Sequence, residues 1–212
     1  MTGHRRLPPL LLATASLRRR CILQSLGITF DTDIPGVREI ALPHDPRGSA
    51  IQNAMLKLDW CRKKYRGHAI ITADTIVVFK DKPIGKPASI RQARQFLRMF
   101  AGCRQSVITA VAFSLPGKPP AVKVAESFVT FRRLSDGQIR EYLAQVDPLD
   151  KAGGYDIDQR GEKIIRSFTG SRTNIMGLPA RIVSNWLRKN GYMPAGRPSR
   201  PRCRGCAGEA FG

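Results

Sequence analysis

The feature that most constrains the fold of this 212-residue chain is a pair of long apolar segments with a turn between them. The segments SVITAVAFSL (106–115) and VKVAESFVTFRRL (122–134) flank the sequence PGKPP at 116–120. Runs rich in Val, Ile, Thr and Phe favour strands, and Pro and Gly between such runs favour a turn. We therefore predict two long antiparallel strands. Because helical patterns are interspersed with further strands, we expect a mixed α/β fold whose sheet is part parallel and part antiparallel.

Another strand pattern, Leu10 to Ala15, leads directly into a helical pattern at about Leu17 to Leu26. Three arginines, Arg18 to Arg20, stand at the start of this helix. Cations are locally unfavourable there, because they meet unpaired N–H groups and the positive end of the helix dipole. Two interpretations stay open. The arginines form a solvated cationic face, or Ser16 caps the helix while amides and guanidiniums bind a phosphate.

A carboxylate interrupts another apolar segment. Asp74 stands in AIITADTIVVF, between the apolar residues 69–71 and 76–79. A carboxylate within a buried strand is costly unless it is paired or binds a metal. The alternative is an aspartate at a strand end, in a turn. Lys86 follows in IGKP and can fold back towards Asp74, although lysine in such a turn is common.

Two further candidates lie before and within a predicted helix from about Gly48 to Tyr65. Glu39 lies in the Pro/Gly-rich loop DIPGVREIALPHDPRG (33–48), where a glutamate is usually only solvated. Lys57 has mostly apolar neighbours at helical spacing, which indicates an ammonium at the edge of a buried face or a snorkelling surface lysine. The loop DPLDKAGGYDIDQRG (147–161) combines charges with glycines that allow a ligand close to the backbone, or only a turn. The following EKIIRSF (162–168) predicts a short strand.

The net charge of the chain is its most extreme compositional feature. It has 36 Lys and Arg against 16 Asp and Glu, which gives +20 and favours anionic partners. A specific nucleic-acid partner is disfavoured, because aromatic residues make up 7% and no recognised binding motif is present. A membrane helix is not expected, since no apolar run reaches about 18 residues. His4, Arg5, Arg6 and the sequence Ala13-Thr14-Ala15 resemble an export signal, but the prolines at 8–9 favour a buried first strand.

Composition divides the chain near residue 194. We expect one domain over 1–193 and a basic, Pro/Gly-rich tail over 194–212 that is disordered, because it has little to bury. Cys203 and Cys206 form a lone C-x-x-C in this tail, which is a weak zinc signal without a second pair of ligands.

Taken in order, the segments LLLATASLRRRCILQSLGITF, ITADTIVV, GKP, VTFRRLSDGQI, DPLDKAGGYDI and NIMGLP resemble the Maf family. The resemblance extends from about Leu10 to Gly191. Each motif alone is modest, but the ordered set is highly specific. Maf proteins are nucleoside triphosphate pyrophosphatases first linked to septum formation. The resemblance implies a Maf/inosine-triphosphatase-like fold: an elongated, twisted mixed β-sheet flanked by helices, with a cleft between two lobes.

The resemblance also implies a set of site residues. Asp74 corresponds to the proton acceptor, Lys57 and Lys86 to catalytic cations, and Glu39 with Asp74 to the ligands of Mg²⁺ or Mn²⁺. Ser16, Arg18 and Arg19 match the phosphate motif. Arg18, Thr75 and Asp158 match the specificity positions.

Arg18 and Thr75 resemble the dTTP/UTP type, since the 7-methyl-GTP type tends to have tryptophan and glutamine there. The sequence departs from the family pattern in three places. Leu17 stands where the family has a proline after the motif serine, and Gln105 stands where it has a histidine. Asp156 and Asp158 stand where the dTTP/UTP type has Gly and Gln. Because position 158 is one of the specificity positions, the last of these departures concerns the base preference.

The sequence thus predicts a cytoplasmic, metal-dependent enzyme that hydrolyses dTTP and UTP, or modified nucleotides, to the monophosphate and diphosphate. The same reaction on 7-methyl-GTP or another purine triphosphate is the alternative. A non-catalytic cell-division regulator and a nucleic-acid-binding protein are alternatives of another class. The resemblance is compatible with a homodimer, and no membrane partner is expected from the apolar runs.

Overall fold

The computed structural model describes residues 7–192. The predicted tail with Cys203 and Cys206, and the residues His4 to Arg6, lie outside the described residues. Within residues 7–192, no helix is long and apolar enough to span a bilayer.

The described part of the chain forms a seven-stranded sheet with the order β2-β1-β3-β5-β6-β7, in which β4 also pairs with β3. β1 is parallel to β2 and β3, whereas β3, β5, β6 and β7 run antiparallel in turn. The predicted hairpin is confirmed, with Arg104 opposite Thr130 and Phe113 opposite Ala121. The strands are β1 Leu10–Ala13, β2 Asp31–Asp33, β3 Ala69–Phe79, β4 Lys82–Ile84, β5 Arg104–Ser114, β6 Ala121–Phe131 and β7 Ile165–Thr169.

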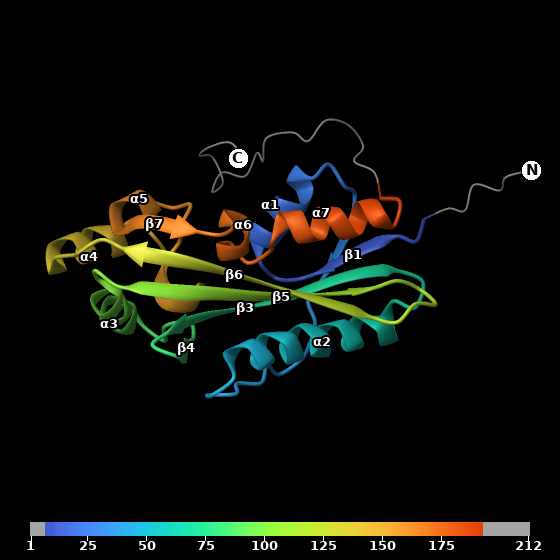
Figure 1. The fold of residues 1–212 in the computed structure, drawn as a ribbon, viewed down its shortest axis with the longest axis horizontal. Coiled ribbons are helices and arrows are strands. Elements are labelled where there is room, and N and C mark those ends of the chain that lie inside the picture. The colour runs from blue at the N-terminus through green and yellow to red at the C-terminus, as the bar shows by residue number, and fades with distance from the viewer. Residues whose placement is uncertain (1–6, 193–212) are drawn as a thin grey trace, which may run out of the picture.

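Helices cover both faces of this sheet (Figure 1). Their bounds are α1 Leu17–Ser25, α2 Pro46–Lys64, α3 Ile90–Phe100, α4 Asp136–Leu143, a short 3₁₀ turn η1 Ala152–Gly154, α5 Gly161–Ile164, α6 Arg172–Ile175 and α7 Ala180–Lys189. A serine caps the start of α4, where Ser135 and Gln138 form a reciprocal capping box. The predicted combination of a mixed sheet and flanking helices is confirmed.

The first strand shows how the layers arise from side-chain alternation. Successive residues of a strand point to opposite faces of its sheet. Leu10 and Leu12 join an apolar cluster that includes side chains of α1 and α7, whereas Leu11 and Ala13 join a cluster built with α2. β1 is thus buried on both faces, which explains its unbroken apolar sequence.

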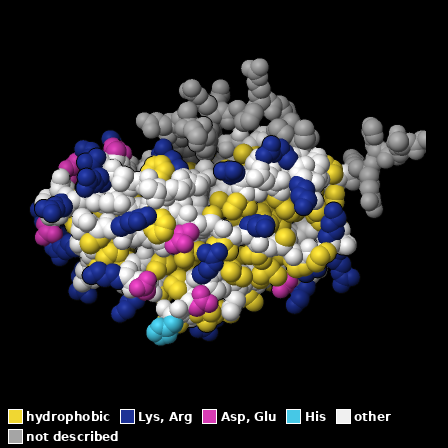
Figure 2. Space-filling view, viewed as in Figure 1, with side chains coloured by type: hydrophobic (Ala, Val, Ile, Leu, Met, Phe, Trp, Pro, Cys, Tyr) yellow, Lys and Arg dark blue, Asp and Glu magenta, His cyan; other side chains and the backbone are white. Residues whose placement is uncertain are grey.

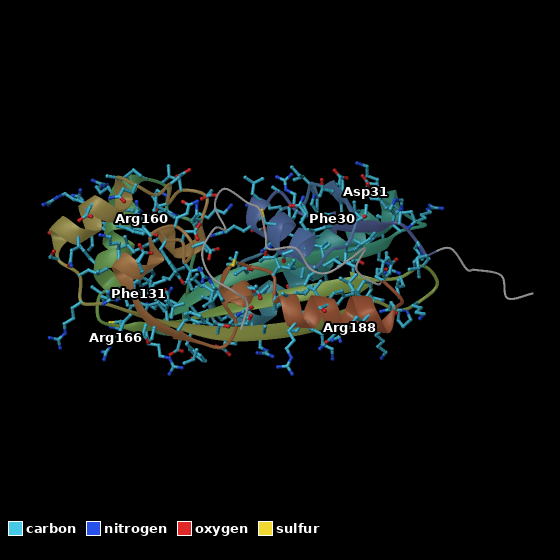
Figure 3. The ribbon with its side chains drawn as sticks, turned by 90° about the horizontal axis from the view of Figure 1, so that it is seen from above. Phe30, Asp31, Phe131, Arg160, Arg166 and Arg188 are labelled. Atoms are coloured by element: carbon cyan, nitrogen blue, oxygen red, sulfur yellow. The ribbon has the colours of Figure 1, made fainter. Side chains whose placement is uncertain are left out.

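A third apolar cluster fills the other end of the elongated sheet, where α3 and α4 lie. Its centre is aromatic, with the ring of Tyr155 edge-on to those of Phe100 and Phe131. Figure 3 shows the two ends from above, with Phe131 and Arg160 far from Phe30 and Asp31. The cleft described below is lined by segments from both ends, so the predicted cleft between two lobes is present.

One local prediction was partly wrong. Residues 161–164, which include the start of the predicted strand at 162–168, form the single-turn helix α5, and the strand β7 begins only at Ile165. Ile164 is fully buried in the aromatic end of the core and Ile165 is largely buried, so both apolar residues pack there. Packing of adjacent side chains towards one core region outweighs the strand propensity of the segment.

Candidate active site

A cleft of about 520 Å³ opens where β1, α1, β3 and the loops at 34–39, 85–86 and 150–159 meet. It brings together residues that lie far apart in the sequence. Of the nine predicted site residues, eight line it: Ser16, Arg18, Arg19, Glu39, Lys57, Asp74, Thr75 and Lys86.

In the wall of the cleft, the ammonium group of Lys57 lies between two carboxylates, those of Asp74 and Glu39. Its Nζ donates to Asp74 Oδ1 at 2.6 Å and lies 2.7 Å from Glu39 Oε1. Asp74 is 5% exposed on β3, opposite Ala110 of β5, so its charge needs this partner. Glu39 is the accessible member, with 59% of its side chain exposed. The prediction of a paired carboxylate within a strand is confirmed, whereas a solvated Glu39 without a partner is not observed.

The electrostatics of Glu39 follow from these contacts. Partial burial by itself raises the pKa of Glu39, but the hydrogen bond and charge of Lys57 outweigh burial and lower the pKa, with smaller contributions from Lys86 and Arg19. Glu39 therefore stays ionised at neutral pH and faces the cleft as an anion.

Asn53 is a residue that the sequence reasoning missed. It lies one helical turn before Lys57 on α2 and is 3% exposed. Its Nδ2 donates to Asp74 Oδ2 at 3.3 Å and to Ile40 O at 3.0 Å, while its Oδ1 accepts from Ile40 N at 2.7 Å. The available signal was its position, since residues four apart share a helix face.

Arg19 is held by the protein itself at the base of the cleft. Its Nε donates to Gly177 O at 2.8 Å, its Nη1 to Ala73 O at 2.9 Å and its Nη2 to Thr75 Oγ1 at 3.0 Å. Burial lowers the pKa of Arg19 although the nearby Asp74 raises it. A guanidinium has five N–H donors, so two N–H groups of Arg19 are not used by these three bonds. If Arg19 binds an anion, as one interpretation of the arginine run proposes, it does so while also holding together the segments around Ala73, Thr75 and Gly177.

Gly177 is required by this arrangement. Its φ is +102°, and a Cβ placed on it would lie 3.2 Å from both Arg19 Nε and Thr75 Oγ1. Glycine tolerates positive φ and leaves the space that the guanidinium occupies.

Arg18 pairs with a further acidic group in the lining of the cleft, Asp156. Its Nη1 lies 3.3 Å from Asp156 Oδ2, and Lys151 Nζ lies 3.8 Å from the same oxygen. Asp156 is 2% exposed, and its Oδ1 accepts from Asp158 N at 2.9 Å. This carboxylate lines the cleft, as does Gln159.

Asp158 is the one predicted site residue that the fold does not bring to the cleft. Its Oδ1 accepts from Arg172 Nε at 3.0 Å and Arg172 Nη2 at 2.8 Å. Burial raises the pKa of Asp158, although the hydrogen bond from Arg172 lowers it. The sequence position aligned with the family's specificity residue thus serves an internal ion pair here.

Ser16 and Lys86 complete the cleft from two loops. Ser16 caps α1 by accepting from Arg19 N at 3.5 Å, as one interpretation of the sequence required. Lys86 is exposed and follows Gly85, whose carbonyl accepts from Gly153 N at 2.9 Å. This bond joins the Lys86 loop to the glycine-rich turn at 152–154.

Comparison with known proteins agrees with this geometry. The family model described as "Maf-like protein" matches residues 9–190. The chain belongs to the Maf-like family. Curated relatives named dTTP/UTP pyrophosphatase include one from Akkermansia muciniphila, 37% identical over 88% of this chain and 98% of its own length. Two others are from Dictyoglomus thermophilum (34%; 86% of this chain, 96% of its own) and Symbiobacterium thermophilum (35%; 86% and 94%).

The Maf resemblance implies a divalent cation. The carboxylates of Glu39 and Asp74 are compatible with a cation that binds as a complex with the substrate. Within residues 7–192, no group of three or more His, Cys, Asp or Glu side chains is placed to hold a metal. Mg²⁺ is commonly bound by one or two carboxylates together with substrate phosphates and water. Glu39 and Asp74 supply two carboxylates around a single ammonium, so they suit a metal–triphosphate complex.

Proposed function

We propose that this Maf-like chain is a nucleoside triphosphate pyrophosphatase that prefers dTTP and UTP and releases the monophosphate and diphosphate. The observation that carries the proposal is the Asp74–Lys57–Glu39 arrangement in the wall of a cleft that Lys86, Arg18 and Arg19 also line. The names of the curated relatives, which are 32–37% identical to this chain, support the same reaction.

In the proposed reaction, a water molecule attacks the α-phosphorus and the bond from that phosphorus to the oxygen bridging the α- and β-phosphates breaks. Asp74 accepts the proton of the water, and the electron pair of the broken bond leaves with the diphosphate. Cations stabilise the growing negative charge on the leaving group. Lys57 lies beside Asp74, while Lys86 is exposed in the cleft without competing for the same carboxylate oxygen. When bound, Mg²⁺ or Mn²⁺ held by Glu39 and Asp74 neutralises phosphate charge.

The preference for a pyrimidine follows from the residues beside the catalytic group. Thr75 presents a small hydroxyl, which is hydrogen-bonded to Arg19 and leaves room for a base. Arg18 offers a hydrogen-bond donor rather than the stacking ring that a methylated purine cation favours. The proposed substrates also place the activity in the cytoplasm, where nucleoside triphosphates are made and used.

The test is a substrate panel with purified full-length protein. It contains dTTP, UTP, CTP, dGTP, ITP and 7-methyl-GTP, each with Mg²⁺ or Mn²⁺, and the diphosphate and monophosphate are quantified separately. The proposal expects kcat/KM values for dTTP and UTP above those for every purine nucleotide. A higher value for 7-methyl-GTP contradicts the base preference. No diphosphate from any nucleotide contradicts the enzymatic proposal and favours a non-catalytic regulator or a binding protein.

A binding assay separates those two alternatives. The face of the molecule in Figure 2 shows Lys and Arg side chains scattered among apolar ones rather than gathered in one stripe. A contiguous basic stripe is the usual electrostatic footprint of a nucleic-acid-binding surface. We therefore expect no sequence-specific binding to DNA, and only salt-sensitive, non-specific binding from the net charge of +20. Binding that depends on the DNA sequence favours the nucleic-acid-binding alternative, and its absence favours the non-catalytic regulator.

A further inference from the structure

Asn53 connects the two carboxylates of the candidate active site without lining the cleft itself. Its side chain is buried on α2, and its three hydrogen bonds use both ends of the amide. Two of these bonds pair with the N–H and the C=O of Ile40, the residue directly after Glu39. The third reaches Asp74 Oδ2.

The bond to Asp74 fixes the orientation of that carboxylate. Lys57 binds Oδ1 at 2.6 Å and Asn53 binds Oδ2 at 3.3 Å, so each oxygen has its own donor from α2. A carboxylate with one donor on each oxygen cannot rotate freely about its terminal torsion. Asn53 thereby sets which oxygen lone pairs remain directed to the cleft.

The bonds to Ile40 fix the other carboxylate. The side chain of Asn53 makes two hydrogen bonds to the backbone of Ile40 in the loop before α2. Two residues after Ile40, the N–H of Leu42 donates to Ser49 Oγ at 2.8 Å. Glu39 is largely exposed, so the anchored backbone beside it, together with its contact to Lys57, determines where its carboxylate stands.

We propose that Asn53 is a positioning residue that holds Asp74 and Glu39 at a fixed separation around Lys57, so that the pair is preorganised for the transition state. This inference rests on the proposed pyrophosphatase function. Asn53 does not line the cleft and makes no contact that a substrate replaces. The effect of its loss therefore falls on kcat more than on KM. Partners of ligating or catalytic carboxylates of this kind typically matter by about 10–100-fold in activity.

Three variants separate this role from simple anchoring of the loop. Asn53→Asp keeps an acceptor for Ile40 N but replaces the amide donor by a second carboxylate next to Asp74. Asn53→Ala removes all three bonds. Ser49→Ala is the matched control, because Ser49 is equally buried on α2 and holds the same loop but makes no contact with Asp74.

The measurements are kcat and KM for dTTP hydrolysis, with thermal unfolding of each variant. We expect Asn53→Ala to lower kcat at least about tenfold with KM within about threefold, and Asn53→Asp to lower kcat further. Ser49→Ala should keep kcat within about threefold of the wild type, even where its unfolding temperature falls as much as that of Asn53→Ala. If Asn53→Asp does not fold, Asn53→Ala and Ser49→Ala still decide the question.

Two outcomes overturn the inference. One is equal loss of kcat in Ser49→Ala and Asn53→Ala, which reduces Asn53 to a loop anchor. The other is a near-normal kcat in both Asn53 variants. Failure of the proposed function is distinguishable, because a wild-type protein without diphosphate release on any nucleotide shows it before a variant is made.

Discussion

Replacing Asp74 by Asn tests the proton acceptor with a side chain of nearly the same shape. In the wild type, Lys57 Nζ donates to Oδ1 at 2.6 Å and Asn53 Nδ2 donates to Oδ2 at 3.3 Å. An amide keeps one oxygen for Lys57 but turns its NH₂ group towards the NH₂ group of Asn53. One hydrogen bond is therefore replaced by a contact between donors, while Lys57 retains Glu39 as an anionic partner at 2.7 Å.

The expected cost to folding is moderate. Loss of a hydrogen bond involving a charged group is worth about 1.5–3 kcal/mol. In a domain of this size, each kcal/mol lowers Tm by about 2–4 °C, so we expect a fall of about 3–12 °C. The expected cost to catalysis is larger, because removal of a general base slows a reaction about 10²–10⁴-fold. At about 1.4 kcal/mol per factor of ten, this is about 3–6 kcal/mol in the barrier.

The assay measures diphosphate release from dTTP at 25 °C, below the unfolding transition of both proteins. The matched control is Asp59→Asn, the same chemical change at an exposed position on α2, which should keep kcat within about twofold. A folded Asp74→Asn protein with kcat within threefold of the wild type would refute the assignment of Asp74 as proton acceptor.

Three further predictions concern two residues that brace the cleft and one ion pair outside it. A lysine in Arg19→Lys cannot reproduce three hydrogen bonds in fixed directions. We therefore expect kcat/KM to fall at least about tenfold in steady-state kinetics and Tm to fall in scanning calorimetry. A normal Tm would show that the bonds to Gly177 and Ala73 contribute nothing to stability. Gly177→Ala introduces a Cβ at positive φ against Arg19 and should destabilise by more than about 1 kcal/mol in urea unfolding, whereas an unchanged midpoint would contradict the steric argument. Burial raises the pKa of Asp158, so the folded state keeps the proton of this carboxyl group to a higher pH than the unfolded state does. The free energy of unfolding therefore falls as pH rises from about 3.9, the ordinary pKa of an aspartate, through the raised pKa of Asp158. The stability of Asp158→Asn relative to the wild type should therefore improve between pH 3.5 and pH 7 in chemical unfolding, and a shift in the opposite direction would show that the ion pair with Arg172 dominates.

Much of the fold was predictable because its signals are local. The apolar segments around the turn at 116–120 carry their strand pattern in consecutive residues, and the hairpin follows from their proximity in the chain. Asp74 was conspicuous because a charged residue in an apolar run needs a partner wherever the run is buried. A local strand signal failed where two adjacent apolar residues, Ile164 and Ile165, both pack into the same region of the core.

The sequence by itself determined which chemistry the chain carries: a carboxylate inside a strand, arginines at the start of a helix, and an ordered set of Maf motifs. The tertiary structure alone decided how these groups are used. It directed Arg19 to backbone carbonyls, moved Asp158 away from the cleft to Arg172, placed Asp156 beside Arg18, and made Asn53 the link between Glu39 and Asp74. The reason is physical: the donors and acceptors of these bonds are separated by 13 to 138 residues, so their pairing depends on the packing of loops and helices around the sheet.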